Sequence, residues 1–205
     1  KTNNLDKSSW RAPMSIAFYN IKNERLSSMN KDSDYEEYFE EWEGHYYYRS
    51  REDYDGLIQY CEKIVKKRPK DLHAKNYLGE AYILNKNYKK ALEYLSPINK
   101  RNPDIDAFKY LILDALYGLG KNENDYKWIK KPNIIDLNDK VIDKCYKYLK
   151  PKRKPRSINE LYMLFMLDGY MRFNELELLK KIKSDPRFIV RDDEIYINRS
   201  FKPKV

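Results

Sequence analysis

Apolar side chains recur every three or four residues along residues 72–103, in two blocks on either side of a polar turn. The members of the two blocks are Leu78, Gly79, Ala81 and Tyr82, then Tyr88, Ala91, Leu92, Leu95 and Ile98. The turn is Asn85-Lys86-Asn87, and Pro103 follows the second block. This period is that of an α-helix, and a proline ends a helix. The segment is therefore predicted to be two antiparallel helices.

The residues before this segment repeat its pattern. Helices are predicted over residues 34–49 and 54–67, and Pro69 precedes Pro103 by 34 residues. A repeat is therefore expected over residues 38–71. In this repeat His45 occupies the position of Gly79, and Leu57 that of Ala91.

The spacing of four residues in the second repeat resembles the tetratricopeptide (TPR) family, which is built from helical hairpins of about 34 residues. Gly79, Tyr82, Ala91 and Pro103 stand at that family's small, aromatic, small and stop positions. We expect Gly79 to face Ala91, because two helices approach closely only where side chains are small. The resemblance implies a helical solenoid that binds a partner protein, since one hairpin cannot bury its apolar face alone.

A third repeat is predicted to begin after Pro103, with a first helix over residues 107–120. Its second helix is not evident, because residues 126–131 are too few. The helix predicted over residues 137–149 is expected to take its place, which gives a solenoid over residues 35–149. Residues 1–34 are expected to form an N-terminal capping segment, or an arm that docks elsewhere.

The last fifty residues have a different pattern, which follows a basic linker at residues 150–156. Helices are predicted over residues 157–167 and 174–183, with a short strand at 170–173 and a hairpin over 187–198. This order resembles a winged-helix domain over residues 157–205. The helix 137–149, assigned above to the solenoid, is alternatively the first of three helices in this domain. The predicted fold class is mainly α: a TPR-like solenoid followed by a small α+β winged-helix-like domain.

Composition narrows the class of partner. Aromatic residues reach 15%, which argues against disorder despite 36% charged residues and a mean hydropathy of −0.91. The net charge of +9 favours nucleic acid, an anionic surface or an acidic partner.

Cys61 and Cys145 lie in apolar helical patterns, so we expect buried thiols in a reducing, cytoplasmic compartment. No apolar run is long enough to span a membrane.

Two sets of residues are candidate binding surfaces. Aromatic side chains on the first helices of the repeats are predicted to form a peptide groove: Trp42, Tyr46, Tyr77 and Tyr110. The alternative is that these rings pack between repeats. Basic side chains in the linker and in the second C-terminal helix are candidate nucleic-acid contacts: Lys150, Lys152, Arg153, Lys154, Arg156, Lys180 and Lys181. The alternative is a solvated linker. Glu175 and Glu177, in the first turn of that helix, repel phosphate and suit the helix dipole instead. A winged domain that binds protein is therefore the alternative to one that reads bases.

Catalysis has little support in the sequence. Arg68 and His73 have an Arg-x4-His spacing found in some helical ribonucleases, but the spacing falls across the proline turn of the repeat. We predict no catalytic, metal or cofactor site. The sequence therefore favours a non-enzymatic adaptor that binds a peptide or helix of a partner protein. The alternative is a nucleic-acid-associated regulator whose basic linker and winged-helix domain contact DNA.

Overall fold

The structure, a computed structural model, describes residues 43–152, 154–165, 168–192 and 194–201 of the 205-residue chain. The described residues form two compact units, 43–132 and 133–201. The predicted capping segment at residues 1–34 and the predicted groove residue Trp42 lie outside them. Each unit is described by itself.

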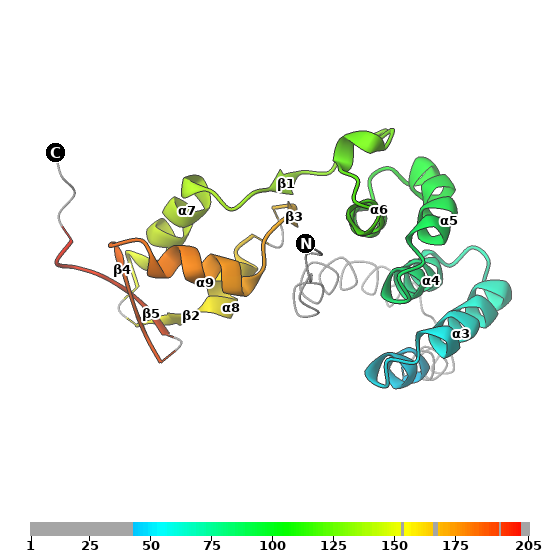
Figure 1. Ribbon diagram of the computed structural model, residues 1–205, viewed down its shortest axis with the longest axis horizontal. Helices are drawn as coiled ribbons and strands as arrows, with labels where there is room; N and C mark the ends of the chain where they lie inside the picture. The colour runs from blue at the N-terminus through cyan, green and yellow to red at the C-terminus, as the bar shows by residue number, and fades with distance from the viewer. Residues whose placement is uncertain (1–42, 153, 166–167, 193, 202–205) are drawn as a thin grey trace, which may run out of the picture. The chain divides into compact units, whose positions relative to one another are not determined.

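The N-terminal unit is a series of helices, and the predicted helical hairpins are confirmed. Residues 43–50 are helical, and the helices that follow are α3 (Tyr54–Lys67), α4 (Leu72–Leu84), α5 (Tyr88–Arg101) and α6 (Asp106–Gly118) (Figure 1). Aspartates begin two of them. Asp53 accepts a hydrogen bond from Gly56 N, and Asp71 accepts hydrogen bonds from the backbone nitrogens of His73 and Ala74. These caps satisfy donors that a helix leaves free in its first turn.

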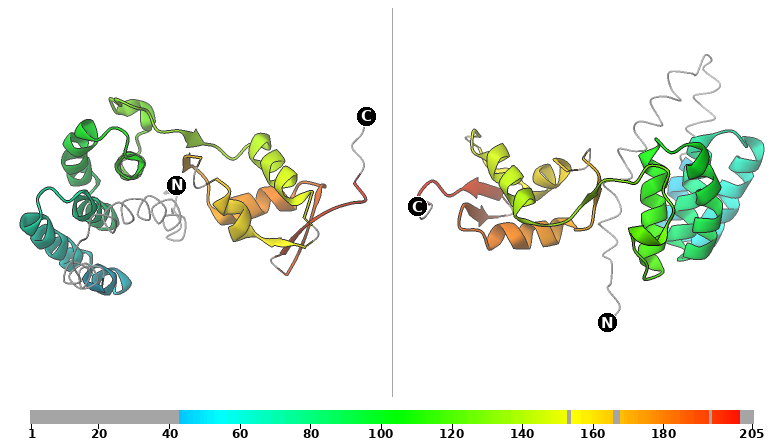
Figure 2. Two further views of the ribbon diagram at one scale, coloured as in Figure 1. Left: turned by 180° about the vertical axis from the view of Figure 1, so that it is seen from behind. Right: turned by 90° about the horizontal axis from the view of Figure 1, so that it is seen from above.

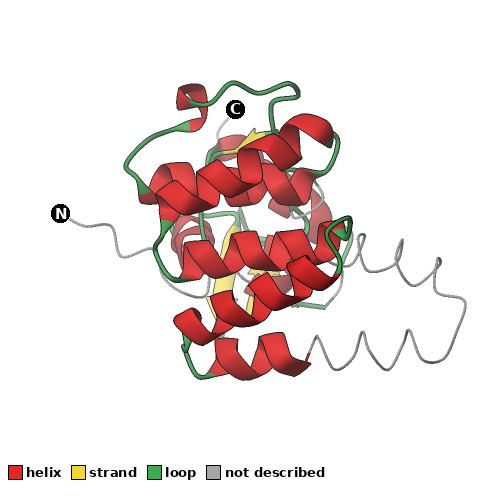
Figure 3. Ribbon diagram, turned by 90° about the vertical axis from the view of Figure 1, so that its right-hand side faces the viewer, coloured by secondary structure: helices red, strands yellow, loops and turns green. Residues whose placement is uncertain are grey.

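Successive helices of this unit pack as antiparallel neighbours. Helix α4 contacts α3, α5 and α6, and α5 contacts α6. Figure 3 shows them as a stack of rods lying side by side. Because α4 touches helices on several sides, ten of its thirteen residues are buried. The first helices of successive repeats, α4 and α6, therefore form one layer.

The close approach between α4 and α5 differs from the predicted one. A Cβ atom at Gly79 would lie 2.5 Å from Cδ2 of Leu95, so Leu95 occupies the space that the glycine leaves. Ala91, predicted to face Gly79, is fully buried but is not the nearest residue. The contact of Gly79 with α5 is therefore centred on Leu95, one helical turn after the predicted Ala91.

A loop closes the third repeat in place of a second helix. Residues 119–132 hold one short 3-10 helix, η1 (Glu123–Asp125), and the Trp128 indole donates to the Glu123 carbonyl at 2.7 Å. Lys130 pairs with Asp104, which ties the loop to the α5–α6 connection. The helix 137–149, which we expected to pack here, belongs to the other unit.

The C-terminal unit combines three helices with short strands (Figure 2). Its elements in order are β1 (Ile134–Ile135), α7 (Asp139–Leu149), β2 (Arg156–Ser157), α8 (Ile158–Met163), β3 (Tyr170–Met171), α9 (Glu175–Lys183), β4 (Phe188–Arg191) and β5 (Glu194–Ile197). An antiparallel sheet has the order β2-β5-β4, and β1 pairs with β3 in parallel. The predicted hairpin is present as β4 and β5.

One apolar core joins α7, α8, α9 and the sheet. Its fully buried members are Cys145, Leu161, Leu178, Ile182 and Ile195. Residues 150–156, predicted as a linker between domains, therefore connect two elements of one unit. The boundary between the two units falls between Pro132 and Asn133 instead.

Two leucines of α9 test this core. Leu178 is completely buried and Leu176 is 63% exposed. Leu178→Ala should lower the free energy of unfolding of the C-terminal unit by about 2–5 kcal/mol, since it removes buried methyl groups and leaves a cavity. Leu176→Ala should change it by less than about 0.5 kcal/mol. Urea unfolding followed by circular dichroism measures both, and equal effects would contradict this placement of α9.

Candidate functional site

The first helices of the repeats bury polar side chains as well as apolar ones. Six buried polar residues lie on the helix 43–50, on α4 or on α6: His45, His73, Asn76, Glu80, Lys109 and Asp114. Buried polar groups are destabilising unless they are paired or hydrogen-bonded. These six residues are therefore a candidate site. The hydrogen bonds and ion pairs that they form show whether their role is structural or functional.

Glu80 is the centre of the best-defined cluster. Its side chain is 1% exposed, and Oε1 lies 2.5 Å from Nη1 of Arg49. Oε2 lies 3.6 Å from Nε2 of His45. Burial raises the pKa of the Glu80 carboxyl, and the neighbouring Arg49 guanidinium opposes that rise. The pair links the helix 43–50 to α4, and thus one repeat to the next.

Aromatic rings extend this cluster along α4. The His45 ring stacks on Tyr77 with 4.2 Å between centroids, and His73 meets Tyr77 edge-on at 4.3 Å. Burial, together with the charges of Arg49 and His73, lowers the pKa of His45 to about 3. His45 is therefore a neutral, stacked ring at neutral pH.

The structure separates the predicted groove residues by exposure. Tyr46 is 65% exposed, whereas Tyr77 and Tyr110 are only 3% and 7% exposed. Burial is the arrangement expected if rings pack between repeats, which was the alternative. Burial also raises the pKa of Tyr110 to about 12. Tyr46 alone of these three offers a free surface, and the groove stays a prediction.

The ion pair of Arg49 and Glu80 was not predicted from the sequence. One signal was present: Glu80 is a single carboxylate within an otherwise apolar stretch, residues 77–84. A carboxylate at such a position is buried with its neighbours when the helix is covered on all sides, and it then needs a cation. The position of Arg49 relative to Glu80 depends on how the helices stack.

The Arg68–His73 spacing serves the fold of the turn. Nη1 of Arg68 lies 3.8 Å from Asp71, the residue that caps α4. His73 is buried against Tyr77. A phosphate group could not reach a histidine in this position without local opening, so this geometry gives the ribonuclease hypothesis no support. In the part of the chain that the structure describes, no three His, Cys, Asp or Glu residues are placed to hold a metal ion.

The structure describes six of the seven predicted nucleic-acid residues, and all six belong to the C-terminal unit. Lys150 caps α7 at its C-terminus, and the Lys152 ammonium lies 5.1 Å from the centroid of the Tyr148 ring. Lys154 is exposed and forms no ion pair with the described residues. Lys180 is likewise exposed, on the last turn of α9.

The remaining predicted cations of this set are either paired or undescribed. Arg156, in β2, lies 3.4 Å from Glu160, and Lys181 lies 3.3 Å from Asp139. Arg153 is outside the described residues. The set therefore divides into lysines that are free to bind and side chains that already neutralise a carboxylate.

The first turn of α9 carries two carboxylates with an exposed leucine between them. Glu177 and Asn174 form a capping box, with Asn174 N donating to Glu177 at 2.9 Å and Glu177 N donating to Asn174 at 2.9 Å. Glu175 and the exposed Leu176 complete this turn. Carboxylates at this position stabilise the helix and repel phosphate.

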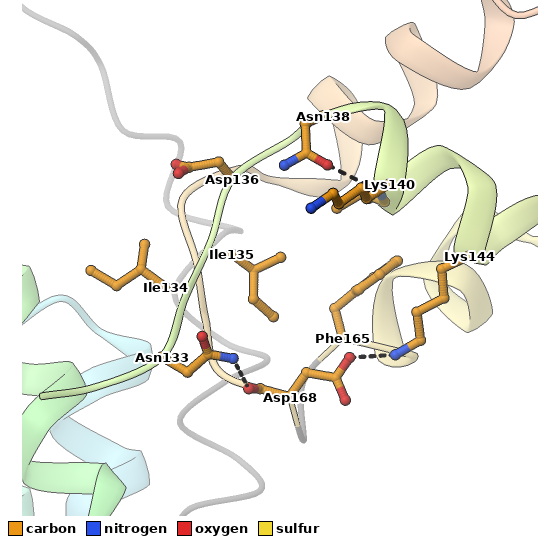
Figure 4. Close-up of a pocket in the computed structure, with 10 residues that line it drawn as sticks. Asn133, Ile134, Ile135, Asp136, Asn138, Lys140, Lys144, Phe165 and Asp168 are labelled. Carbon is orange, nitrogen blue, oxygen red and sulfur yellow. Dashed lines mark hydrogen bonds and ion pairs between the residues drawn. The ribbon is translucent and has the colours of Figure 1, made fainter.

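An open cavity of about 450 Å³ lies beside the start of α7 (Figure 4). Most of its polar side chains already have a hydrogen-bond partner within the unit. Lys144 pairs with Asp168, whose carbonyl accepts a hydrogen bond from Asn133 at 2.6 Å, and Asn138 caps α7. Lys140 is the one lining cation with no ion pair among the described residues. The cavity offers too few converging groups to define a ligand.

Comparison with known families assigns the helical part. Residues 48–112 match the tetratricopeptide-repeat model, from the helix 43–50 through α3, α4 and α5 into α6. Residues 48–112 are tetratricopeptide repeats. The resemblance carried by Gly79, Tyr82, Ala91 and Pro103 is thereby confirmed. Neither curated proteins nor solved structures gave a match to the chain.

TPR repeats generally mediate protein–protein interactions, and the family generally consists of scaffolds without catalytic activity. The C-terminal unit lies outside the match. Among the described residues, no helix has the length and apolar character that crossing a bilayer requires.

The pair in the TPR region predicts a specific pattern of stability. Arg49→Ala should lower the free energy of unfolding by about 2 kcal/mol, because it leaves the Glu80 carboxylate buried without its cation. The loss should be smaller than for a fully buried pair, since Arg49 is 30% exposed. Adding Glu80→Gln should recover most of it. Arg51→Ala, which removes an arginine that stacks on Tyr47, is the matched control; equal losses in the two arginine variants would refute the role of the pair.

His45 predicts a loss of stability in mild acid. Its folded-state pKa of about 3 lies below the ordinary value of 6.5, so the unfolded chain binds the proton more tightly. The contribution of neutral His45 is complete above pH 6.5 and is lost as the pH falls toward 3. Between pH 7.5 and about 5 this amounts to about 2 kcal/mol.

The variant His45→Phe isolates this term, because phenylalanine keeps the stacked ring and does not titrate. Denaturant unfolding of both proteins across this pH range measures the difference. The wild type should lose more stability than the variant on acidification. Parallel pH profiles would show that His45 is not held neutral in the folded chain.

Proposed function

We propose that the protein is a non-enzymatic adaptor whose TPR region binds a peptide or helix of a partner protein. The observation that carries the proposal is the family match over residues 48–112, on helices that pack as consecutive hairpins. A stack of hairpins presents the surfaces of its first helices as one continuous layer. Binding, not catalysis, is what such a layer offers.

Equivalent positions of successive repeats differ in exposure, and the exposed one is our candidate for the binding face. Tyr46, Glu80 and Asp114 follow one another at intervals of 34 residues, on the helix 43–50, α4 and α6. They therefore occupy equivalent positions of three successive repeats. Tyr46 is exposed, and a tyrosine supplies a large contact area together with a hydrogen-bonding hydroxyl. We place the partner against Tyr46, with Trp42 as a neighbouring aromatic contact, whereas Tyr77 and Tyr110 are buried and would support this face from beneath.

The absence of an enzymatic role is part of the proposal. Two strongly perturbed titratable groups of the TPR region, His45 and Glu80, are buried in a pairing that joins two repeats. A catalytic base or acid must reach its substrate. These two side chains are placed to stabilise the stack.

The C-terminal unit is proposed to be a winged-helix-like module that docks a second partner. Its order of elements is β1-α7-β2-α8-β3-α9-β4-β5, and the three helices with the sheet β2-β5-β4 support this topology. Helix α7 shares the core with α8 and α9, which supports the alternative in which the helix 137–149 is the first of three helices. The exposed Leu176 between Glu175 and Glu177 suits contact with protein better than contact with bases.

A cytoplasmic location is proposed with it. Cys61 and Cys145 are free thiols buried in separate cores. Burial raises the pKa of Cys145 to about 12, so this thiol is unreactive in the folded chain. Two buried thiols suit a reducing compartment.

Two adjacent tyrosines test the adaptor proposal. Tyr46 and Tyr47 are both exposed, but successive residues point about 100° apart around a helix. Tyr46→Ala should weaken partner binding by about tenfold, as expected for an aromatic contact worth more than 1 kcal/mol. Tyr47→Ala should leave binding unchanged.

The measurement begins with a pull-down from native lysate, with nuclease present and at high salt. A partner recovered under both conditions is then purified, and its affinity for the wild type and both variants is measured by calorimetry. If both variants bind as the wild type does, the face is misplaced. If every protein recovered is lost with nuclease or salt, the adaptor proposal fails.

A further inference from the structure

Most of the excess positive charge belongs to the C-terminal unit. Residues 133–205 contain 17 Lys and Arg against 11 Asp and Glu, which is six of the chain's net charge of +9. An excess of this size on a small unit matters for binding only if the charges are gathered in one place. The topology of the sheet decides where they lie.

Helix α7 ends where β4 begins. The Tyr146 ring meets Phe188, the first residue of β4, edge-on with 6.0 Å between centroids. One turn later the backbone nitrogen of Lys150 donates to the Tyr146 carbonyl at 2.9 Å. Strand β2 follows and runs antiparallel to β5, with Arg156 opposite Ile195. Residues before Arg156 therefore lie toward Ile197, which pairs with Phe188 at the start of β4. Lys154 lies toward this end of the sheet.

Helix α9 leads into the start of β4, and strand β5 ends beside that start. Phe188 N donates to the Asp185 carbonyl at 3.1 Å, so the last turn of α9 leads directly into β4. Asn198 N donates to the Arg187 carbonyl at 2.8 Å, which brings the end of β5 alongside. Arg199 follows immediately. The hairpin turn at residues 191–194 is at the other end of both strands.

The structure thus gathers six exposed cations, which we call the cationic end: Lys150, Lys152, Lys154, Lys180, Lys183 and Arg199. None of the six forms an ion pair with a residue that the structure describes. Other cations of the unit are neutralised locally, as Arg187 is by Asp143 at 2.6 Å and by Asp185 at 2.7 Å. The same two contacts occupy the carboxylates of Asp143 and Asp185.

The unpaired acidic side chains lie elsewhere. Glu175 and Glu177 are at the opposite end of α9 from Lys180 and Lys183, and Glu194 is in the hairpin, at the far end of the strands. The unit is therefore electrically polarised along its strands. The polarisation is opposite to what readout by the first turn of α9 would need.

We propose that the cationic end binds the phosphodiester backbone of nucleic acid without reading its sequence. Six lysine and arginine side chains over three elements can follow several successive phosphates and release their counterions. Base recognition needs side chains in a groove; the acidic first turn of α9 and the acidic hairpin supply none. The inference is independent of the proposed adaptor role.

A membrane surface fits this end less well than nucleic acid does. Stable binding of a protein to an anionic bilayer usually combines basic residues with apolar side chains that insert. The exposed large apolar residues of the described C-terminal unit are Met163, Leu176 and Tyr196. None of them belongs to the cationic end.

The test measures binding of the full chain to a labelled duplex by fluorescence anisotropy. Two duplexes of about 25 base pairs with unrelated sequences should bind with equal affinity. Their affinity should fall by about a hundredfold or more between about 50 and about 200 mM salt, as expected for four or more phosphate contacts. Single-stranded DNA and duplex RNA are the arms that show which backbone is preferred.

Three variants assign the surface. The triple variant Lys150→Ala, Lys152→Ala, Lys154→Ala should weaken binding at low salt by at least about tenfold and reduce the salt slope by about 2–3. A control with the same change in charge replaces three exposed lysines of the other unit, Lys100, Lys121 and Lys127, by alanine and should alter affinity by less than about threefold. Glu175→Gln should leave affinity unchanged, because the first turn of α9 is not in contact.

Several outcomes would overturn the proposal. Equal losses in the two triple variants would mean that net charge alone drives binding. Tighter binding by Glu175→Gln together with a preference between the duplexes would place nucleic acid on the first turn of α9. Stronger binding to vesicles containing about 30% phosphatidylserine than to DNA at the same salt would assign a membrane. No binding of any duplex at low salt would leave these lysines as stabilising charges at helix C-termini.

Discussion

The close approach of α4 and α5 at Gly79 is the constraint on which the TPR region depends. A Cβ atom at this position would lie 2.5 Å from Leu95, so these helices reach their observed distance only because one of them has no side chain there. Leu95 then fills the gap and is fully buried. With α5 held this close, α4 is covered by helices on several sides, and its polar residues are buried with its apolar ones.

Burial of that polar face explains the chemistry of the first helices. A carboxylate such as Glu80 cannot stay buried and charged without a cation, and Arg49 supplies one from the preceding helix. A buried ion pair contributes little net stability compared with apolar residues of the same volume. It does penalise any arrangement of the two repeats in which the partners separate. The cluster of His45, Tyr77 and Glu80 therefore sets how one repeat sits on the next, while the exposed Tyr46 is available to a partner.

In the C-terminal unit, topology separates charges that are mixed along the chain. Glu175 and Lys183 lie eight residues apart in sequence, at opposite ends of α9. Antiparallel pairing places Arg199 close to the residues that follow Lys183, and the hairpin with Glu194 far from them. Local ion pairs, such as those of Arg187, remove the carboxylates that would neutralise the cationic end. A modest net charge becomes a concentrated one by this means.

The sequence by itself determined the helices of the TPR region, their turns and their family, because these depend on local periodicity, capping and proline stops. Residues such as Asp71, Gly79 and Pro103 act within one or two turns of the chain. Tertiary structure alone decided that Leu95 fills the space at Gly79, that Arg49 meets Glu80, and that α7 joins the C-terminal core. It also showed Tyr77 and Tyr110 to be buried where the pattern allowed a groove. Each of these depends on the distance and angle between elements far apart in sequence, and periodicity carries no information about either.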